Sequence, residues 1–314
     1  MNRVQRQRLL WRTGFFALFL LAPPLDLFRY DLTQGHFILF AHPWMLGIDA
    51  NNATQSVVNL ILRGFLPIAT LVGLGIWVSW RYGRLYCGWL CPHFSVVETI
   101  NALMRRASGK PTLWEKQPLP RHQRDGVQVE PKAVYWWLVA VAVVFFSALW
   151  AITLLTYLLP PAEVWGNLLH GTLTRNQALF LGVATGLLTI EFSLARHLFC
   201  RFGCAIGLFQ SLVWMANRRA LVVGFDRRRA LVCAGCDRSC EHACPMRLRP
   251  RQIKRRIFTC TQCQQCVQAC DRVNLPEGQP GLLRMVSGPC AEETPERSQK
   301  RSVVQPDDCF VKTD

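Results

Sequence analysis

Basic residues are almost absent from two long stretches of this chain and abundant in the others. No Lys or Arg occurs within residues 30–56, and only Arg175 occurs within 160–176. By contrast, residues 81–132 hold nine basic residues and residues 196–256 hold fourteen. This alternation is typical of membrane proteins, whose cytoplasmic loops carry an excess of Lys and Arg. We therefore attribute the net charge of +16 to membrane topology and expect no nucleic-acid partner.

Charge is also missing from long apolar runs, four of which approach the roughly 20 residues that a spanning helix needs. These predicted spans are residues 13–28, 57–80, 133–159 and 177–194. An even number of spans with both termini in the cytoplasm puts every basic loop on the cytoplasmic side. No small-residue cleavage site precedes Pro23 and Pro24, which argues against a removed signal peptide. The sequence thus predicts a multi-pass protein of the bacterial inner membrane that contacts lipid.

The fourteen cysteines do not follow the pattern of a small disulfide scaffold, because they accompany eleven tryptophans and long apolar runs. The strongest motif is Cys260-x2-Cys263-x2-Cys266-x3-Cys270, the spacing of bacterial ferredoxins. A similar motif with one additional residue before its third cysteine lies upstream. It comprises Cys233, Cys236, Cys240 and Cys244, followed by Pro245. The two motifs predict two 4Fe-4S clusters.

In the usual crossover, the fourth cysteine of each motif ligates the cluster of the other motif. One predicted ligand set is therefore Cys233, Cys236, Cys240 and Cys270, and the other is Cys260, Cys263, Cys266 and Cys244. Zinc is an alternative occupant, although zinc sites normally have wider separations between their Cys pairs. A second alternative is that one cluster is altered, because of the inserted residue and because Asp271 follows the last cysteine.

Two further cysteine pairs lie after the second and fourth predicted spans. Cys87 and Cys91 form one pair, and Cys200 and Cys204 form the other. In each pair the four-residue spacing places both thiols on one face of a helix. Thiolates in such a pair suit Cu(I), an iron–sulfur cluster or a reversible disulfide, and the remaining interpretation is a small apolar residue in a buried helix. Because the spacing occurs twice, we expect a metal or redox role.

We divide the chain into three parts. Residues 1–230 form a four-span α-helical membrane domain, and residues 231–286 form a small cytoplasmic ferredoxin-like domain that holds two clusters. Residues 287–314 form a polar tail that we expect to be disordered. The sequence predicts a redox partner protein in the membrane or periplasm, but it does not predict an oligomeric state or a catalytic residue.

The motifs together resemble the membrane polyferredoxins. The similarity rests on Cys-Gly-Trp-Leu-Cys-Pro-His at 87–93, Phe-Cys-Arg-Phe-Gly-Cys at 199–204 and Val-Val-Gly-Phe-Asp at 222–226. Within this group the chain resembles most the cytochrome c oxidase accessory proteins of the CcoG (FixG, RdxA) type, because of Cys270-Asp-Arg-Val273, Pro280-Gly-Leu282 and Arg284. Those proteins usually continue into an immunoglobulin-like domain. In size the chain is more similar to quinol dehydrogenase subunits of the NapH type, and Ala205 replaces the proline of the family pattern.

The resemblance implies two versions of an electron-transfer role. Similarity to the CcoG type implies an accessory protein that reduces copper for assembly of a haem–copper oxidase. Similarity to the NapH type implies oxidation of a quinol for a periplasmic enzyme. Two alternatives come from other functional classes. One is a zinc-stabilised membrane scaffold, and the other is a redox sensor that signals through the pairs Cys87/Cys91 and Cys200/Cys204. Whether the chain is itself an enzyme stays open at this point.

Overall fold

The computed structural model describes residues 2–49 and 51–291, and the chain folds as two compact units. The first unit comprises the residues up to Arg12, Ile76–Trp136 and the residues from His197 onward. The second comprises Thr13–Gly75 and Trp137–Arg196. The twelve cysteines of the predicted motifs all belong to the first unit.

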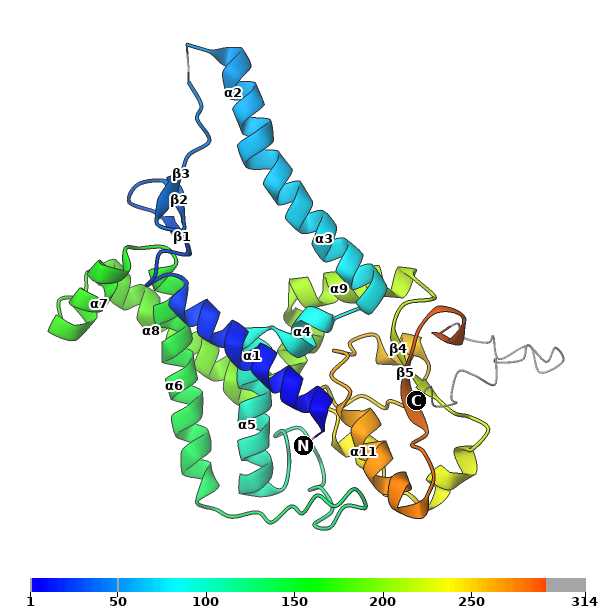
Figure 1. Ribbon diagram of the computed structural model, residues 1–314. Coiled ribbons are helices and arrows are strands. Elements are labelled where there is room, and N and C mark those ends of the chain that lie inside the picture. The colour runs from blue at the N-terminus through cyan, green and yellow to red at the C-terminus, as the bar shows by residue number, and fades with distance from the viewer. Residues whose placement is uncertain (1, 50, 292–314) are drawn as a thin grey trace. The chain divides into compact units, whose positions relative to one another are not determined.

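Three helices in the described part of the chain are long and apolar enough to cross a membrane. They are Ala53–Tyr82, Tyr135–Thr156 and Arg175–Ala195, with mean hydropathies of 1.9, 2.6 and 1.8. The first consists of α2 (Ala53–Asn59), a π-helix (Leu60–Phe65) and α3 (Leu66–Tyr82), the long blue and cyan helix of Figure 1. The second is α6 (Tyr135–Thr156), and the third joins α8 (Arg175–Ile190) to a π-helix (Glu191–Ala195). Three of the four predicted spans thus coincide with helices that are long and apolar enough to cross a membrane.

Pro67 explains the π-helical turn inside the first of these helices. Proline has no amide hydrogen, so the carbonyl of Arg63, four residues earlier, loses its helical partner. The indole Nε1 of Trp44 donates a hydrogen bond of 3.1 Å to this carbonyl oxygen. The widened turn Leu60–Phe65 precedes the proline, as π-turns often do where the helical hydrogen-bond pattern is interrupted. The helix therefore continues through Pro67 to Tyr82.

The predicted span at residues 13–28 is not among the helices that meet the criteria for a membrane span. Here the structure has α1 (Arg3–Leu21), which begins ten residues earlier and includes four arginines. The helix ends before Pro23 and Pro24, which have no amide hydrogens to extend it. Phe28, the predicted end of the span, starts strand β1 (Phe28–Asp31). The prediction that the helix reaches Phe28 is therefore wrong.

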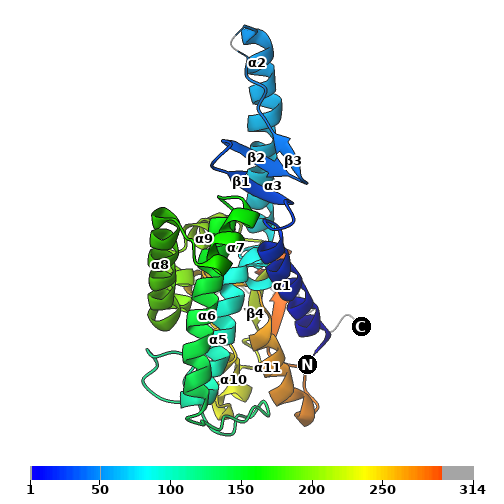
Figure 2. The same ribbon diagram turned by 90° about the vertical axis from the view of Figure 1, so that its left-hand side faces the viewer.

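A small antiparallel sheet lies in the second unit, in the basic-poor stretch. Strand β1 pairs with β2 (His36–Leu39), which pairs with β3 (His42–Trp44), and the three strands lie side by side in Figure 2. Asp31 closes the first turn by accepting hydrogen bonds from the backbone amides of Thr33 and Gln34. The other basic-poor stretch forms α7 (Pro161–His170).

The first unit contains short helices around an amphipathic one. After α4 (Leu85–Trp89), helix α5 (Pro92–Ser108) starts with Pro92 at its first turn and ends before Gly109, whose φ is 74°. Proline at the start and a left-handed glycine after the end are typical helix boundaries. Helix α9 (Ala205–Ala216) of this unit is apolar. The buried side chains of α5 include Phe94, Val97 and Ile100.

The cysteine-rich region combines one two-stranded sheet with short helical turns. Strand β4 (Val222–Phe225), which precedes the predicted domain boundary at 231, pairs antiparallel with β5 (Leu283–Val286). The turns between them are Ala230–Gly235, α10 (Ser239–His242), Lys254–Ile257, α11 (Gln265–Asn274) and Leu275–Glu277. In the predicted tail, Gly288–Ala291 form a 3-10 turn, and the rest of the tail lies outside the described residues.

Candidate metal centres

Four cysteines from both ferredoxin-type motifs line one cavity. They are Cys233, Cys236, Cys240 and Cys270. The first three come from the upstream motif, whereas Cys270 comes from α11 in the downstream motif. Leu282 and Leu283, at the start of β5, line the same cavity. The structure thus brings together the first predicted ligand set, with its crossover cysteine.

The other four cysteines line a second cavity. They are Cys244, Cys260, Cys263 and Cys266. Here Cys244 is the crossover residue, and the apolar side chains of Val223, Met246 and Ile257 complete the lining. The two cavities therefore divide the eight cysteines as the spacing predicts, including the motif that has an additional residue before Cys240.

The backbone of the downstream motif turns twice through the left-handed region. Gln262 has a φ of 56° and Gln264 a φ of 60°, and these residues flank Cys263. Successive amides in turns of alternating handedness form concave nests that bind anionic groups, including iron–sulfur clusters. Arg238 and Arg247 adopt positive φ values of 63° and 53° beside the cysteines of the upstream motif. Both motifs thus have the loop conformation of an anion cradle.

Hydrogen bonds to sulfur support the same interpretation. The amide of Leu282 donates to Cys270 Sγ at 3.2 Å, and the amide of Leu248 donates to Cys244 Sγ at 3.4 Å. Asn274 Nδ2 donates to Cys270 Sγ at 3.5 Å. Such donors stabilise thiolates and influence the reduction potential of a bound cluster. These donors therefore stabilise negative charge on the sulfurs of the two crossover cysteines.

Asp271 has a structural role in this arrangement. Its carboxylate Oδ1 accepts a hydrogen bond of 3.2 Å from the amide of Gly281. A β-carbon on Gly281 would stand 2.3 Å from the same oxygen, so only glycine permits this approach. The contact holds the segment in which Leu282 donates to Cys270 Sγ. Asp271, which departs from the ferredoxin pattern, thus helps to position a donor to its neighbouring cysteine.

Burial raises the pKa of these thiols. It raises the pKa of Cys240, Cys244 and Cys260 to about 12, and that of Cys266 well above its usual value. Neighbouring cysteines raise the values further. The thiolate form of such groups needs positive charge nearby, which iron supplies on binding. The donor set therefore fits a metal cluster better than a set of free thiolates.

The eight thiols are not arranged around single points. In the described part of the chain, no three His, Cys, Asp or Glu side chains converge closely enough to share one metal ion. A tetrahedral zinc site needs such convergence, since each Zn–S bond is roughly 2.3 Å long. A 4Fe-4S cube instead takes one thiolate at each of its four iron corners. Each cavity offers four cysteines, which is the donor set that such a cube takes.

The two membrane-edge pairs also come together. Arg84 connects them, because its Nη2 donates to the Cys200 carbonyl oxygen at 2.7 Å and lies 3.8 Å from Cys87 Sγ. Cys87 Sγ donates to Gln210 Oε1 at 3.4 Å, and Cys200 Sγ lies 3.7 Å from His93 Nδ1. Within each pair the second cysteine caps the next helix, Cys91 before α5 and Cys204 before α9, so the prediction that each pair shares one helix face is wrong. The two pairs still form a second group of cysteines in one unit, here called the membrane-edge group: Cys87, Cys91, Cys200 and Cys204.

The membrane-edge group is shielded from solvent. Cys87 and Cys200 are buried, and so is the guanidinium of Arg84. Burial raises the pKa of Cys87, and the positive charge of Arg84 offsets part of this increase. Burial also raises the pKa of Cys91, to about 12. Cys204 lies close enough to both thiols to raise their pKa values. These thiols resemble those of the two cavities in their burial and mutual proximity.

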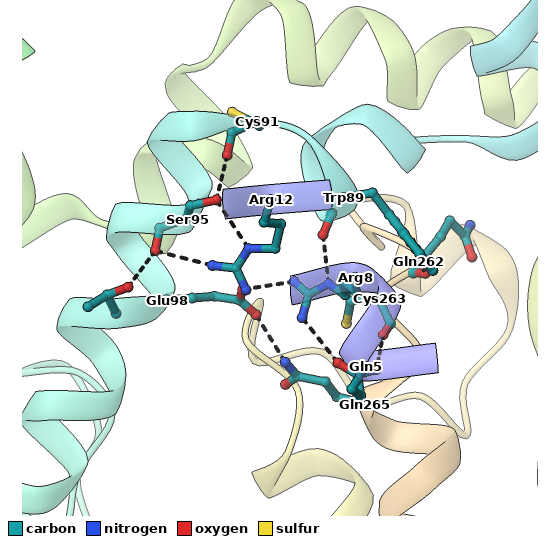
Figure 3. A network of polar contacts seen from close by, with 12 residues as sticks. Gln5, Arg8, Arg12, Trp89, Cys91, Ser95, Glu98, Gln262, Cys263 and Gln265 are labelled. Carbon is teal, nitrogen blue, oxygen red and sulfur yellow. Dashed lines mark hydrogen bonds and ion pairs between the residues drawn. The ribbon is translucent and has the colours of Figure 1, made fainter. Parts of the chain in front are cut away.

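The membrane-edge group lies against the loop of the second cavity. Trp89 Nε1 donates a hydrogen bond of 3.2 Å to the carbonyl oxygen of Gln262, which lies between Cys260 and Cys263. Gln5 Nε2 donates to the carbonyl oxygen of Cys263 at 2.7 Å (Figure 3). Since Trp89 lies between Cys87 and Cys91 in sequence, one tryptophan connects the two groups of thiols.

Three charged residues that the sequence analysis did not assign to the site hold this contact in place. Glu98 on α5 binds both Arg8 and Arg12 of α1, and Arg8 Nε donates to the carbonyl oxygen of Gly88 at 2.7 Å (Figure 3). Arg8 is only 2% exposed. In the sequence these arginines count only toward the net charge of +16, which was attributed to membrane topology. The signal that could have revealed the site is Glu98 itself, the single acidic residue within 50–114.

Comparisons with known proteins agree with this chemistry. Residues 64–111, which include Cys87 and Cys91, match the family model of a 4Fe-4S binding domain. The chain is 24% identical over 251 residues to YccM of Escherichia coli (strain K12), which is named provisionally as an electron transport protein. This match covers 77% of the chain and 66% of YccM, so the chain spans just under two thirds of that protein.

A second relative is the uncharacterized protein MJ0749 of Methanocaldococcus jannaschii. It is 25% identical over 227 residues, which cover 69% of this chain and 75% of MJ0749. No solved structure matches the chain. Together with the two cysteine-lined cavities, these similarities support an iron–sulfur protein that transfers electrons.

Proposed function

We propose that this chain is a membrane-bound electron-transfer protein whose eight cysteines between Cys233 and Cys270 hold two 4Fe-4S clusters. The observation that carries the proposal is the division of these cysteines between two cavities, four in each, with one crossover residue per cavity. When bound, such clusters gain and lose single electrons. The three apolar helices support a place in a membrane, for which we propose the bacterial inner membrane with the clusters on the cytoplasmic side.

The membrane-edge group is the next redox site in this proposal. Cys87 and Cys91 fall inside the segment that matches a 4Fe-4S binding domain, which favours a cluster there over copper or a disulfide. Arg84 contacts the group and partly balances its charge, and Gln210 accepts a hydrogen bond from Cys87 Sγ. The Trp89 contact then gives electrons a short route between the membrane-edge group and the second cavity.

The finer role that we favour is an accessory protein for a respiratory or periplasmic oxidoreductase, in which the membrane-edge group passes electrons onward. One acceptor that we propose for this role is Cu(II), reduced to Cu(I) for assembly of a haem–copper oxidase. The other version is a quinol dehydrogenase subunit that passes electrons to a periplasmic enzyme. Purified protein that reduces Cu(II) and leaves a quinol analogue unoxidised would support the first version and exclude the second.

Low-temperature EPR of the anaerobically reduced protein, combined with iron and sulfide analysis, tests the proposal. Two clusters correspond to about eight irons per chain, and a third at the membrane-edge group raises this to about twelve. The double variant Cys87→Ala/Cys91→Ala then separates the two cases, because it removes about four irons only if the membrane-edge group binds a cluster. Protein that contains zinc and no acid-labile sulfide would contradict the proposal and favour a zinc-stabilised scaffold.

A further inference from the structure

An open cavity of about 340 Å³ lies beside Cys233. It is lined by Phe225, Ala230, Cys233, Arg238, Glu241, Arg249, Arg251 and Gln252. Cys233, Arg238 and Arg251 also line the first cysteine cavity, so the open cavity borders that group of thiols. Cys233 is half-buried, whereas its cavity partner Cys240 is buried. The first cavity is therefore approached from outside at Cys233.

Positive charge dominates this open cavity. Its lining includes three arginines and one glutamate. Glu241 is engaged with Arg251, whose Nη2 lies 2.6 Å from its carboxylate. The side chains of Arg238 and Arg249 are exposed, and neither forms an ion pair with another described residue. Among the described residues, no acidic side chain pairs with these two guanidinium groups, which suit an anionic partner.

Apolar side chains stand beside the charges. Leu231 is 88% exposed and Val232 is 36% exposed, and both precede Cys233 in the turn Ala230–Gly235. An exposed leucine beside arginines adds apolar contact area to a charged surface, and arginine is enriched among the residues that dominate binding at protein interfaces. We call this set the Cys233 surface: Leu231, Val232, Cys233, Arg238, Arg249 and Arg251.

We propose that the Cys233 surface docks a small acidic protein that carries single electrons. This inference rests on the proposed function, because it requires a cluster at the four thiols of the first cavity. The positive charge of this surface, taken alone, would equally attract anionic lipid. The half-buried cluster ligand in the same cavity favours a redox protein, since the electron then crosses only the short distance from the carrier to Cys233. In that transfer the carrier loses one electron and the bound cluster gains it, while no bond forms or breaks.

Complementary charge has a definite consequence for binding. Attraction between an acidic carrier and exposed arginines is screened by salt, with a Debye length of about 10 Å at 0.1 M. Reversing one such charge therefore weakens association strongly at low salt and little at high salt. Leu231 contributes through apolar contact, so its removal weakens binding to a similar extent at both salt concentrations.

The test measures binding of a reduced acidic 2Fe-2S ferredoxin to the full chain in nanodiscs of neutral phosphatidylcholine. We expect Arg249→Glu to weaken binding about tenfold at low salt, with a much smaller difference at high salt. Arg256→Glu is the matched control, since Arg256 is exposed in the neighbouring turn but does not line the cavity. Leu231→Ser is expected to weaken binding about fivefold at both salt concentrations. Equal affinity of Arg249→Glu and Arg256→Glu would overturn the proposal.

Two further measurements separate the alternatives. Anaerobic EPR after reduction by a small neutral viologen shows whether each variant still holds its clusters. If the clusters are absent even from the unchanged protein, the proposed function fails. If they are present and the ferredoxin does not bind, the docking inference alone fails. Nanodiscs that contain anionic phosphatidylglycerol complete the test, because loss of ferredoxin binding there would assign the Cys233 surface to lipid instead.

Discussion

Gly88 and Thr261 approach each other so closely that a β-carbon at position 88 would stand 1.9 Å from the Thr261 carbonyl oxygen. Gly88 lies between Cys87 and Cys91, and Thr261 follows Cys260. The two groups of thiols therefore meet through backbone, at a point where no side chain fits. This contact and the hydrogen bond from Trp89 to Gln262 both link the membrane-edge group to the second cavity.

Gly88→Ala tests this contact. The methyl group cannot fit beside backbone, so the segment 85–91 must shift away from the loop of the second cavity. We expect a loss of stability of about 1–3 kcal/mol, the range for overpacked core positions. The measurement is thermal unfolding in detergent, with iron content as a second readout. Gly14→Ala is the control, since a β-carbon at that position would have no atom within 4 Å and the helix tolerates alanine. Equal stability of both variants would contradict the close approach.

Glu98→Gln tests the buried network at the N-terminal helix. The change removes the negative charge that Arg8 and Arg12 share, and leaves two guanidinium groups in a desolvated place. Burial lowers the pKa of Arg12, and the negative charge of Glu98 offsets part of this decrease. We expect a loss of about 3–5 kcal/mol, as for other broken buried ion pairs. Thermal unfolding provides the measurement, and Glu130→Gln at an exposed position is expected to have no effect.

The crossover arrangement predicts which variants lose the same cluster. Cys270 and Cys266 share α11 but line different cavities. Cys270→Ala is therefore expected to remove the same EPR signal as Cys233→Ala. Cys266→Ala is expected to remove the same signal as Cys260→Ala. If Cys270→Ala instead removed the signal that depends on Cys260, each motif would hold its own cluster and the crossover would be wrong.

Asp31 gives the turn between β1 and β2 a dependence on pH. Burial by itself raises the pKa of the Asp31 carboxyl. Hydrogen bonds from Thr33 and Arg29 lower this pKa by more than burial raises it, so the net value is about 2. Because the folded value lies below the unfolded value of about 3.9, its contribution is fully present above about pH 4. It is lost as the pH falls through about 2. We expect amide exchange at Thr33 and Gln34 to accelerate in this range after correction for intrinsic rates.

Asp31→Asn provides the comparison for that measurement. The amide cannot ionise, so exchange in the turn should be faster at pH 5 than in the unchanged protein and should no longer depend on pH between 5 and 2. A variant that keeps the same pH profile would show that another group controls the turn.

The amino-acid sequence alone determined the apolar helices and the cysteine sets. Three spans were predicted because hydropathy over about 20 residues depends only on composition. The division of eight cysteines between two cavities was predicted because ferredoxin spacing limits which thiols a short loop can bring together. The additional residue before Cys240 did not change that division, since the left-handed conformation at Arg238 accommodates it.

Only the tertiary structure decided what the charged N-terminus does and how the motifs meet. Arg8 was indistinguishable in sequence from a topology charge, because its burial depends on Glu98, 90 residues away. The pairing of β4 with β5 joins segments about sixty residues apart, and no local pattern specifies it. The approach of Gly88 to Thr261 likewise depends on packing between distant segments. Composition and spacing act along the chain, whereas these contacts arise from the free energy of burying distant groups together.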